Sequence, residues 1–393
     1  MHDFTSGVIS IRARGASLPE IVGKELGTGV RHVIRIFSVL LLILVGAVFV
    51  ITPASLIGGM TLEWMDQWFW VGVIFLYYMM ATVLPIDKLI GNLYPIFGIA
   101  LLFMATGLLA VMLFSSDVTL SLDFAGGLSS RVSDPQSHPV FPMMFVSIAC
   151  GAISGFHATQ SPMMARCLTN EKLAKPIFYG AMVAEGIVAL IWAAAAIAFT
   201  GGYERLAEYF ATHTGGAGTL VTDISMTWLG AIGGILAIIG VVAAPITSGD
   251  TALRSARLIV ADMLHIGQAK AWKRLLISIP IFALVSVLLL IDFTVLWRYF
   301  AWSNQTLAVF TLWAATVYLA RHRKAYMITL APAAFMAVVC VSYILFAPCT
   351  EGFGLSADLS LGTGIATAIV FICLFSGHIR RLSSQSINLK TDY

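Results

Sequence analysis

Polar residues that could bind a small ligand gather in one short stretch of an otherwise apolar sequence, residues 150–162. Their side chains offer hydroxyl, amide and imidazole groups, and they are Ser154, His157, Thr159, Gln160 and Ser161. Pro162 ends the stretch and cannot donate a backbone amide to a helix. One interpretation is an unwound helix that lines a substrate cavity, because freed backbone groups need partners there. The other is an ordinary helix end that packs through Gly151 and Gly155.

Oxygen ligands for a coupling ion occur in a second stretch, residues 243–251. It holds two hydroxyls and a carboxylate, those of Thr247, Ser248 and Asp250, shortly after Pro245. Such hard oxygens beside a helix break suit Na⁺ or a proton-linked carboxylate. The alternative is a helix cap, in which Asp250 or Ser248 accepts the first amides of a following helix.

Three further polar residues lie inside apolar runs. Glu185 is a candidate proton carrier, because a buried carboxylate tends to stay neutral; the alternative is a snorkelling or hydrogen-bonded residue near the inner face. Asn304 could contact substrate, or it could join helices together with Gln305. His157 could accept a proton near neutral pH, or it could be a hydrogen-bonded structural residue. Motifs typical of hydrolases, zinc sites and P-loops do not occur, so the sequence predicts neither an enzyme nor a metal site.

Membrane helices must position these groups. The sequence is 59% hydrophobic and 11% charged, against about 25% charged residues in soluble domains, so lipid must cover most of the surface. No basic run suggests nucleic acid. Ten stretches are long and apolar enough to span a bilayer as helices. They are residues 32–51, 65–84, 95–114, 140–157, 176–200, 224–245, 275–291, 295–320, 326–346 and 361–378.

The basic residues predict the orientation of these spans. With the N-terminus in the cytoplasm, only Arg131, Arg205 and Arg298 of the 23 Lys and Arg residues fall outside, as the positive-inside rule requires. The sequence therefore predicts an all-α, multi-pass protein of a cytoplasmic membrane with both termini in the cytoplasm. Residues 251–264 alternate basic and apolar side chains, which predicts an amphipathic helix at the membrane face.

Several motifs closely resemble the carbon starvation protein A (CstA) family. They are residues 150–167, 178–192, 244–259 and 297–307. His2-Asp3-Phe4 and residues 21–24 are similar to the family as well. The resemblance implies a prokaryotic inner-membrane protein for uptake of peptides or pyruvate during carbon starvation. It also implies a fold related to the amino acid–polyamine–cation superfamily, which often places a Na⁺ site where Thr247 and Ser248 would lie.

The sequence differs from the family pattern at the start of the chain. Family members normally carry further spans before the His-Asp-Phe motif, which here stands almost at Met1. On an inverted-repeat fold, residues 1–114 are the remainder of the first repeat without its first helix. Residues 140–320 are then the second five-helix repeat and residues 321–393 two extra spans, all in one membrane domain, 1–393. We therefore expect a truncated, split or misannotated member.

The predicted function is secondary active uptake by alternating access, with substrate bound near the midplane where helices break. The predicted substrate contacts are Ser154, His157, Thr159, Gln160, Ser161 and Asn304. The predicted groups for a coupling ion, H⁺ or Na⁺, are Thr247, Ser248, Asp250 and Glu185. These roles come from the chemistry of the side chains and not from the family motif. The alternative is a binding or sensor subunit that does not transport. The substrate, the coupling ion and the oligomeric state stay open.

Overall fold

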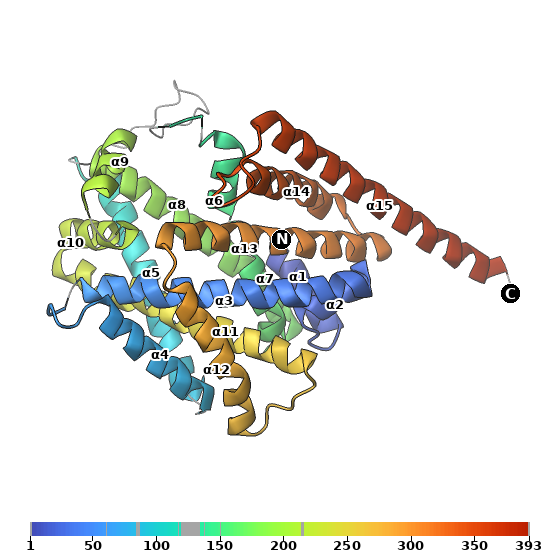
Figure 1. Ribbon diagram of the computed structural model, residues 1–393, viewed down its shortest axis with the longest axis horizontal. Helices are drawn as coiled ribbons and strands as arrows, with labels where there is room; N and C mark the ends of the chain where they lie inside the picture. The colour runs from blue at the N-terminus through green and yellow to red at the C-terminus, as the bar shows by residue number, and fades with distance from the viewer. Residues whose placement is uncertain are drawn as a thin grey trace. The chain divides into compact units, whose positions relative to one another are not determined.

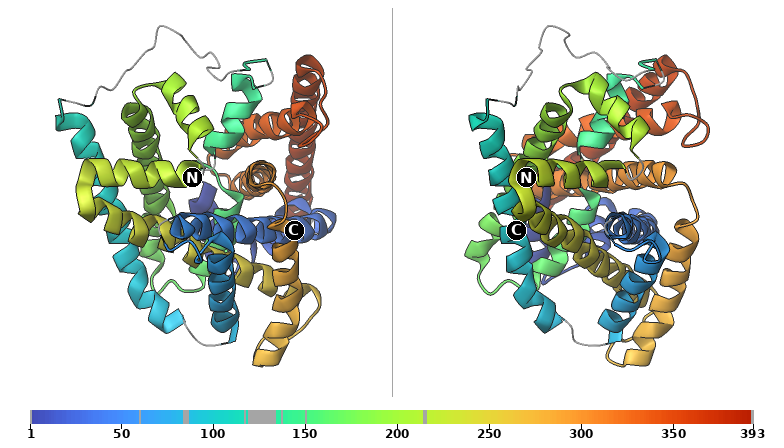
Figure 2. Two further views of the ribbon diagram at one scale, coloured as in Figure 1. Left: turned by 60° about the vertical axis from the view of Figure 1, so that its left-hand side comes forward. Right: turned by 90° about the vertical axis from the view of Figure 1, so that its left-hand side faces the viewer.

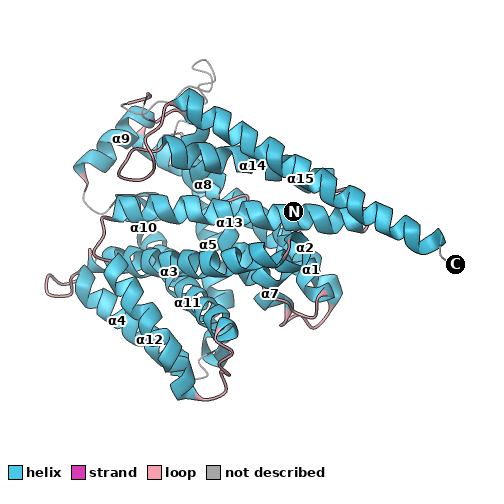
Figure 3. Ribbon diagram, turned by 45° about the vertical axis from the view of Figure 1, so that its right-hand side comes forward, coloured by secondary structure: helices cyan, strands magenta, loops and turns pink. Residues whose placement is uncertain are grey.

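The computed structural model describes the chain except residues 1, 60, 84–86, 117, 119–133, 137, 150, 214–215 and 392–393. The described part is helical and contains no strand (Figure 3), as the sequence predicts. Helices satisfy backbone amides and carbonyls within one segment, which lipid demands because it offers no hydrogen bonds.

All ten predicted spans fall on helical segments of the described chain. Seven helices are long and apolar enough to cross a membrane, and two shorter apolar helices, Gln67–Val83 and Val140–Ala149, match two more predicted spans. The tenth, α13 (Phe293–Arg321), is less apolar because it contains Asn304 and Gln305. Its 29 residues give about 43 Å at 1.5 Å each, enough for a hydrocarbon core of about 30 Å. The chain is a multi-pass helical membrane protein.

The helices form two compact units that interleave along the chain. The first unit consists of Met1–Leu41, Gln136–Val183 and Thr294–Tyr393, and the second of Leu42–Pro135 and Ala184–Phe293. Helices α3 (Thr28–Gly58) and α8 (Ala181–Thr200) pass from one unit into the other. The division into two inverted repeats and two extra spans stays a prediction.

The first unit packs its helices around α13. Its other helices are α1 (His2–Arg12), α2 (Leu18–Leu26), α6 (Phe145–Ala149), α7 (Gly155–Ala165), α14 (Met327–Phe346) and α15 (Ala357–Thr391). Helices α14 and α15 lie side by side (Figures 1 and 2). Trp313, Ala337 and Phe375 belong to the core that joins both of them to α13. A smaller cluster of Ile9, Ile21 and Ala315 packs α1 and α2 on the same helix.

The second unit has its own apolar core. Its further helices are α4 (Gln67–Val83), α5 (Asp87–Phe114), α9 (Tyr203–Thr212), α10 (Gly216–Ala237), α11 (Ala243–Met263) and α12 (Ala271–Leu288). Met104 and Leu108 of α5 pack with Ile191 of α8 and Ile224 of α10. These apolar contacts explain why α5, α8 and α10 stay together.

The predicted helix break beside Pro245 is wrong. The backbone stays helical through Pro245, because the π-helical turn η4 (Ile238–Val242) leads directly into α11 (Ala243–Met263), and such local π adjustments let a membrane helix accommodate a proline. Ser248 and Asp250 therefore lie inside the helix, and the predicted cap does not form. The backbone departs from helical geometry earlier, at Gly230 in α10, whose φ is 64°.

The predicted amphipathic helix 251–264 is also wrong as a surface element. These residues continue α11 to Met263. Leu253, Arg257 and Ile259 are all buried, so protein covers basic and apolar positions alike. Alternation of residue types could not reveal this, because a buried arginine and an interfacial arginine have the same spacing.

Ion pairs hold α13 near both of its ends. Arg298 Nη1 bonds both carboxylate oxygens of Glu351, at 2.6 Å to Oε2. At the other end, Arg321 Nη1 donates to Glu25 Oε2 at 2.9 Å. Both carboxylates are buried, and a buried carboxylate is costly without such a partner. The two pairs tie α13 to α2 and to the loop that follows α14.

We expect Glu351→Gln to destabilise the protein, because it removes a charged bidentate acceptor from Arg298. The loss should be about 1.5–3 kcal/mol, read as a lower thermal transition in detergent. The matched control is Glu171→Gln, which breaks the exposed Arg12–Glu171 pair and should cost less than about 1 kcal/mol. Equal decreases of the thermal transition temperature in the two variants would show that the Arg298–Glu351 pair stabilises the protein no more than the exposed pair does.

Candidate functional site

The interruption predicted in the fourth span lies between α6 and α7. Helix α6 ends at Ala149 and α7 starts at Gly155. Ser154 is extended, with φ −126° and ψ 123°, and its Oγ accepts the backbone amide of His157 at 3.3 Å. Ser154 is thus the N-cap of α7, the position where a serine side chain replaces the missing helical acceptor.

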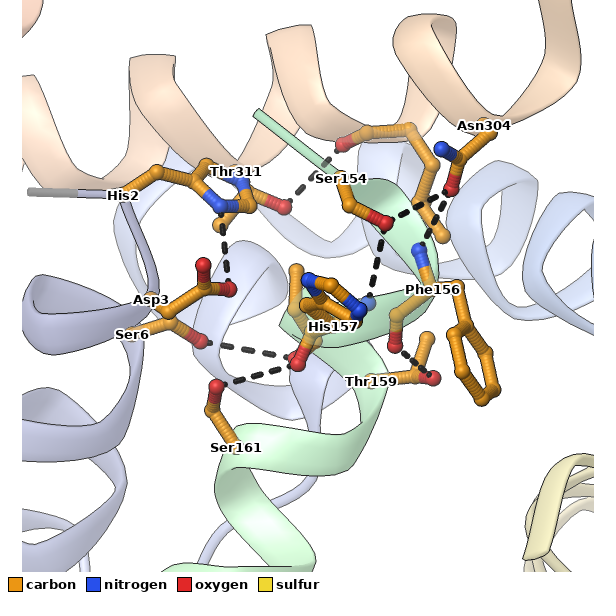
Figure 4. A network of polar contacts seen from close by, with 12 residues as sticks. His2, Asp3, Ser6, Ser154, Phe156, His157, Thr159, Ser161, Asn304 and Thr311 are labelled. Atoms are coloured by element: carbon orange, nitrogen blue, oxygen red, sulfur yellow. Dashed lines mark hydrogen bonds and ion pairs between the residues drawn. The ribbon is translucent and has the colours of Figure 1, made fainter. Parts of the chain in front are cut away.

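Asn304 of α13 completes this cap from a distant part of the sequence. Its Oδ1 accepts the backbone amide of Phe156 at 2.7 Å and the hydroxyl of Ser154 at 3.2 Å (Figure 4). Asn304 is 0% exposed and Ser154 is 1% exposed. The interpretation that Asn304 joins helices is therefore confirmed, and protein provides the partners that the break requires.

Gly155 allows α7 and α13 to meet at this point. A Cβ at Gly155 would lie 2.4 Å from the carbonyl oxygen of Asn304 and 2.6 Å from Cβ of Leu307. Both distances are shorter than side chains tolerate, and backbone cannot move aside easily. The glycine is thus needed for close helix approach, which is the role that small residues have at membrane helix contacts.

Pro162 does not end the helix, contrary to the prediction. It lies inside α7, which continues to Ala165. A proline leaves the carbonyl four residues earlier without its helical donor, here that of Ala158. The hydroxyl of Ser6 from α1 donates to this oxygen at 3.4 Å, and Ser6 is buried. The carbonyl freed by the proline thus accepts a hydrogen bond from α1.

A pair of histidines and a carboxylate lie where α1 meets α7. His2 Nδ1 is 3.2 Å from Asp3 Oδ1, and both residues are 3% exposed. His157 of α7 lies across from Asp3 (Figure 4) and interacts with it electrostatically. Sequence reasoning used His2 and Asp3 only as a family motif and missed them as site residues. The signal was present: a histidine next to an aspartate in a largely apolar protein.

The remaining predicted substrate contacts lie on α7 as well. Thr159 Oγ1 donates to the Phe156 carbonyl at 2.7 Å, and Ser161 Oγ donates to the His157 carbonyl at 3.0 Å. Both hydroxyls therefore bond their own helix. Gln160 is half-buried and donates to Thr159 Oγ1 at 3.3 Å. The structure thus brings all six predicted substrate residues together in the first unit.

The predicted ion-coupling residues belong to the second unit. Thr247 Oγ1 donates to the carbonyls of Ala243 and Ala244, each at 3.0 Å. Asp250 is buried, and its Oδ2 accepts from Arg254 Nη2 at 2.9 Å. This guanidinium already balances the carboxylate charge that a metal cation would use.

Glu185 and Ser248 are the other two predicted coupling residues, and they are less buried than Thr247 and Asp250. Glu185 lies on α8, within an apolar span, and its side chain is exposed at the surface of the protein. Ser248 is half-buried, and its carbonyl accepts the hydroxyl of Thr251 at 2.8 Å. Their roles in coupling stay predictions.

These features define a polytopic membrane protein with an interrupted helix and a buried polar cluster. The sequence was compared with known protein families. The model of the family described as carbon starvation protein CstA matches residues 55–226 of this chain. The chain belongs to this family.

Individual relatives match the chain over part of its length. An uncharacterized membrane protein of Haemophilus influenzae is 38% identical over 51% of this chain and 66% of its own length. The pyruvate/proton symporter BtsT of Escherichia coli is 43% identical over 21% of this chain and 11% of the symporter. The peptide transporter CstA of Campylobacter jejuni is 40% identical over 22% of this chain and 12% of the transporter. The chain thus covers less than two thirds of each of these relatives.

We expect Asn304→Ala to loosen the start of α7, because the amide of Phe156 loses its acceptor where water is scarce. The cost should be about 1–3 kcal/mol, with faster hydrogen exchange in peptides that contain residues 154–158. Thr311→Val is the matched control on α13, because the Thr311 hydroxyl donates to the Leu307 carbonyl of its own helix. Unchanged exchange in Asn304→Ala would show that the cap does not depend on this side chain.

Proposed function

We propose that the chain is part of a secondary active transporter that takes up peptides or small carboxylates such as pyruvate across a cytoplasmic membrane. Substrate binds at the α6–α7 break, and the first unit alternates between access from the two sides. The proposed coupling ion is H⁺. Both termini face the cytoplasm, in line with the basic residues that the predicted inside segments carry.

One observation supports this proposal most: an interrupted helix lies next to a buried group of titratable side chains. Transporters commonly place their substrate and coupling-ion sites at discontinuous helices. Ionisable residues inside a membrane protein are costly and tend to mark such pathways. The break at Ser154 and the group of His2, Asp3 and His157 meet both criteria within one unit.

The choice of H⁺ follows from the chemistry of the available carboxylates. Asp3 interacts with His2 and His157, and a histidine can take up and release a proton near neutral pH. Asp250 instead faces the permanent charge of Arg254 at 2.9 Å, which disfavours an additional cation. The name of the BtsT symporter includes proton coupling, which agrees with this choice.

In this proposal, substrate contacts the side chains that do not take part in the N-cap of α7. Ser154 and Asn304 are buried and bonded to each other and to α7. We therefore assign them to holding the break open. His157 and Gln160 are half-buried and form the proposed contacts to a peptide or carboxylate, with Thr159 and Ser161 completing the polar surface.

We expect Asp3→Asn to uncouple transport from the proton gradient. Purified protein in proteoliposomes should accumulate labelled pyruvate or tripeptide under an inside-alkaline gradient, and the variant should lose this accumulation. Exchange of labelled for unlabelled substrate without a gradient should persist, because it needs no net proton movement. Asp358→Asn, at an exposed position, is the matched control. Gradient-driven accumulation at the wild-type level in Asp3→Asn would reject this proton site.

We expect Gln160→Ala to weaken substrate binding without uncoupling it. Loss of one hydrogen bond of about 1 kcal/mol should raise KM about fivefold, with little change in gradient dependence. Gln136→Ala, at an exposed position, controls for the loss of a glutamine. An unchanged KM would remove Gln160 from the site. Binding of substrate by wild-type protein with no uptake under any gradient would favour the sensor alternative instead.

A further inference from the structure

A cavity in the first unit has no role in the proposed transport site. Its volume is about 690 Å³, and its walls come from α13, α15 and the junction of α2 with α3. This volume falls within the range of roughly 300–1,000 Å³ that small-ligand sites occupy. Every lining residue belongs to the first unit, so the cavity is a property of that unit alone.

The wall of the cavity is apolar and partly aromatic. Trp313 of α13 meets Phe371 and Phe375 of α15 edge to face or tilted, with ring centroids 5.7 and 6.2 Å apart. Val370 and Leu374 also line the cavity and are 52% and 65% exposed. The cavity therefore opens sideways between apolar side chains, toward the place of lipid tails around a membrane helix.

One end of the cavity is basic. Arg381 and His378 lie there, together with Glu25. The Glu25 carboxylate is already paired with Arg321 at 2.9 Å, so its charge is balanced. Arg381 is also the last residue of the apolar span of α15, which puts its guanidinium at the level of lipid headgroups on the predicted cytoplasmic side.

We propose that this cavity binds one anionic phospholipid. The phosphate pairs with Arg381 and His378, and an acyl chain lies along the wall formed by Trp313, Phe371 and Phe375. Basic pockets between membrane helices on the cytoplasmic side recognise anionic headgroups in this way. The site is separate from the polar cluster of α1 and α7, and it does not depend on the proposed transport activity.

The headgroup contact can be tested by native mass spectrometry of the detergent-purified chain, titrated with phosphatidylglycerol or phosphatidylcholine. We expect tighter binding of phosphatidylglycerol, and an approximately fivefold loss of its affinity in Arg381→Gln, the effect of one basic residue at a membrane surface. The matched control is Lys324→Gln, which removes an exposed basic residue outside the cavity. Equal affinity for the two lipids would overturn the proposal.

The acyl-chain contact has an independent test on α15. Gly377 lines the cavity, and a side chain there would meet no atom within 4 Å, so Gly377→Leu should fill the cavity without harming the fold. Binding of both lipids should then fall. Gly362→Leu is the matched control, because Gly362 also faces open space on α15 but does not line the cavity. Unchanged lipid binding in Gly377→Leu, or a second copy of the chain in place of bound lipid, would overturn the proposal.

Discussion

The structure of the first unit depends on one requirement: backbone groups exposed by an interrupted membrane helix must find partners inside the protein. Water is scarce among apolar helices, and each unsatisfied group costs several kcal/mol. At the start of α7 the partners are the Ser154 hydroxyl and the Asn304 side chain. Near its middle, the Ala158 carbonyl that Pro162 cannot serve accepts the hydroxyl of Ser6. Two defects in one helix thereby receive partners from neighbouring helices, α13 at its start and α1 near its middle.

This requirement also explains the unusual composition of α13. The helix carries Asn304 and Gln305 at 0% exposure, and these amides lower its apolar character below that of the other spans. A lipid-facing helix could not tolerate them, whereas a helix surrounded by protein can use them as hydrogen-bonding groups. A helix this deeply buried needs small residues on the helices that face it, and Gly155 of α7 allows a close approach to α13. Polarity, burial and close packing of α13 thus have a common cause.

Sequence reasoning predicted the spans well because lipid acts on each window of about 20 residues largely independently of its neighbours. It also predicted an interruption in the fourth span from the polar residues that crowd positions 154–161. It misjudged both prolines, because the effect of a proline depends on facts beyond its neighbours. Pro245 does not break its helix because a π-helical turn of residues 238–242 precedes it, and Pro162 is tolerated since a serine from α1 lies near the freed carbonyl. Asp3 and His157 were seen separately, because only tertiary packing brings them together.

The same packing gives the buried carboxylates different neighbours. A coupling residue must change its charge during the cycle, so a permanent cation at hydrogen-bond distance is a poor neighbour because it holds the carboxylate ionised. Asp250 has such a neighbour in Arg254, and Glu351 has one in Arg298. Asp3 has the imidazoles of His2 and His157 among its neighbours, together with the N-terminal amine, and an imidazole can change its charge near neutral pH. In the proposed transport cycle, this contact between α1 and α7 is the place where proton binding is linked to helix movement.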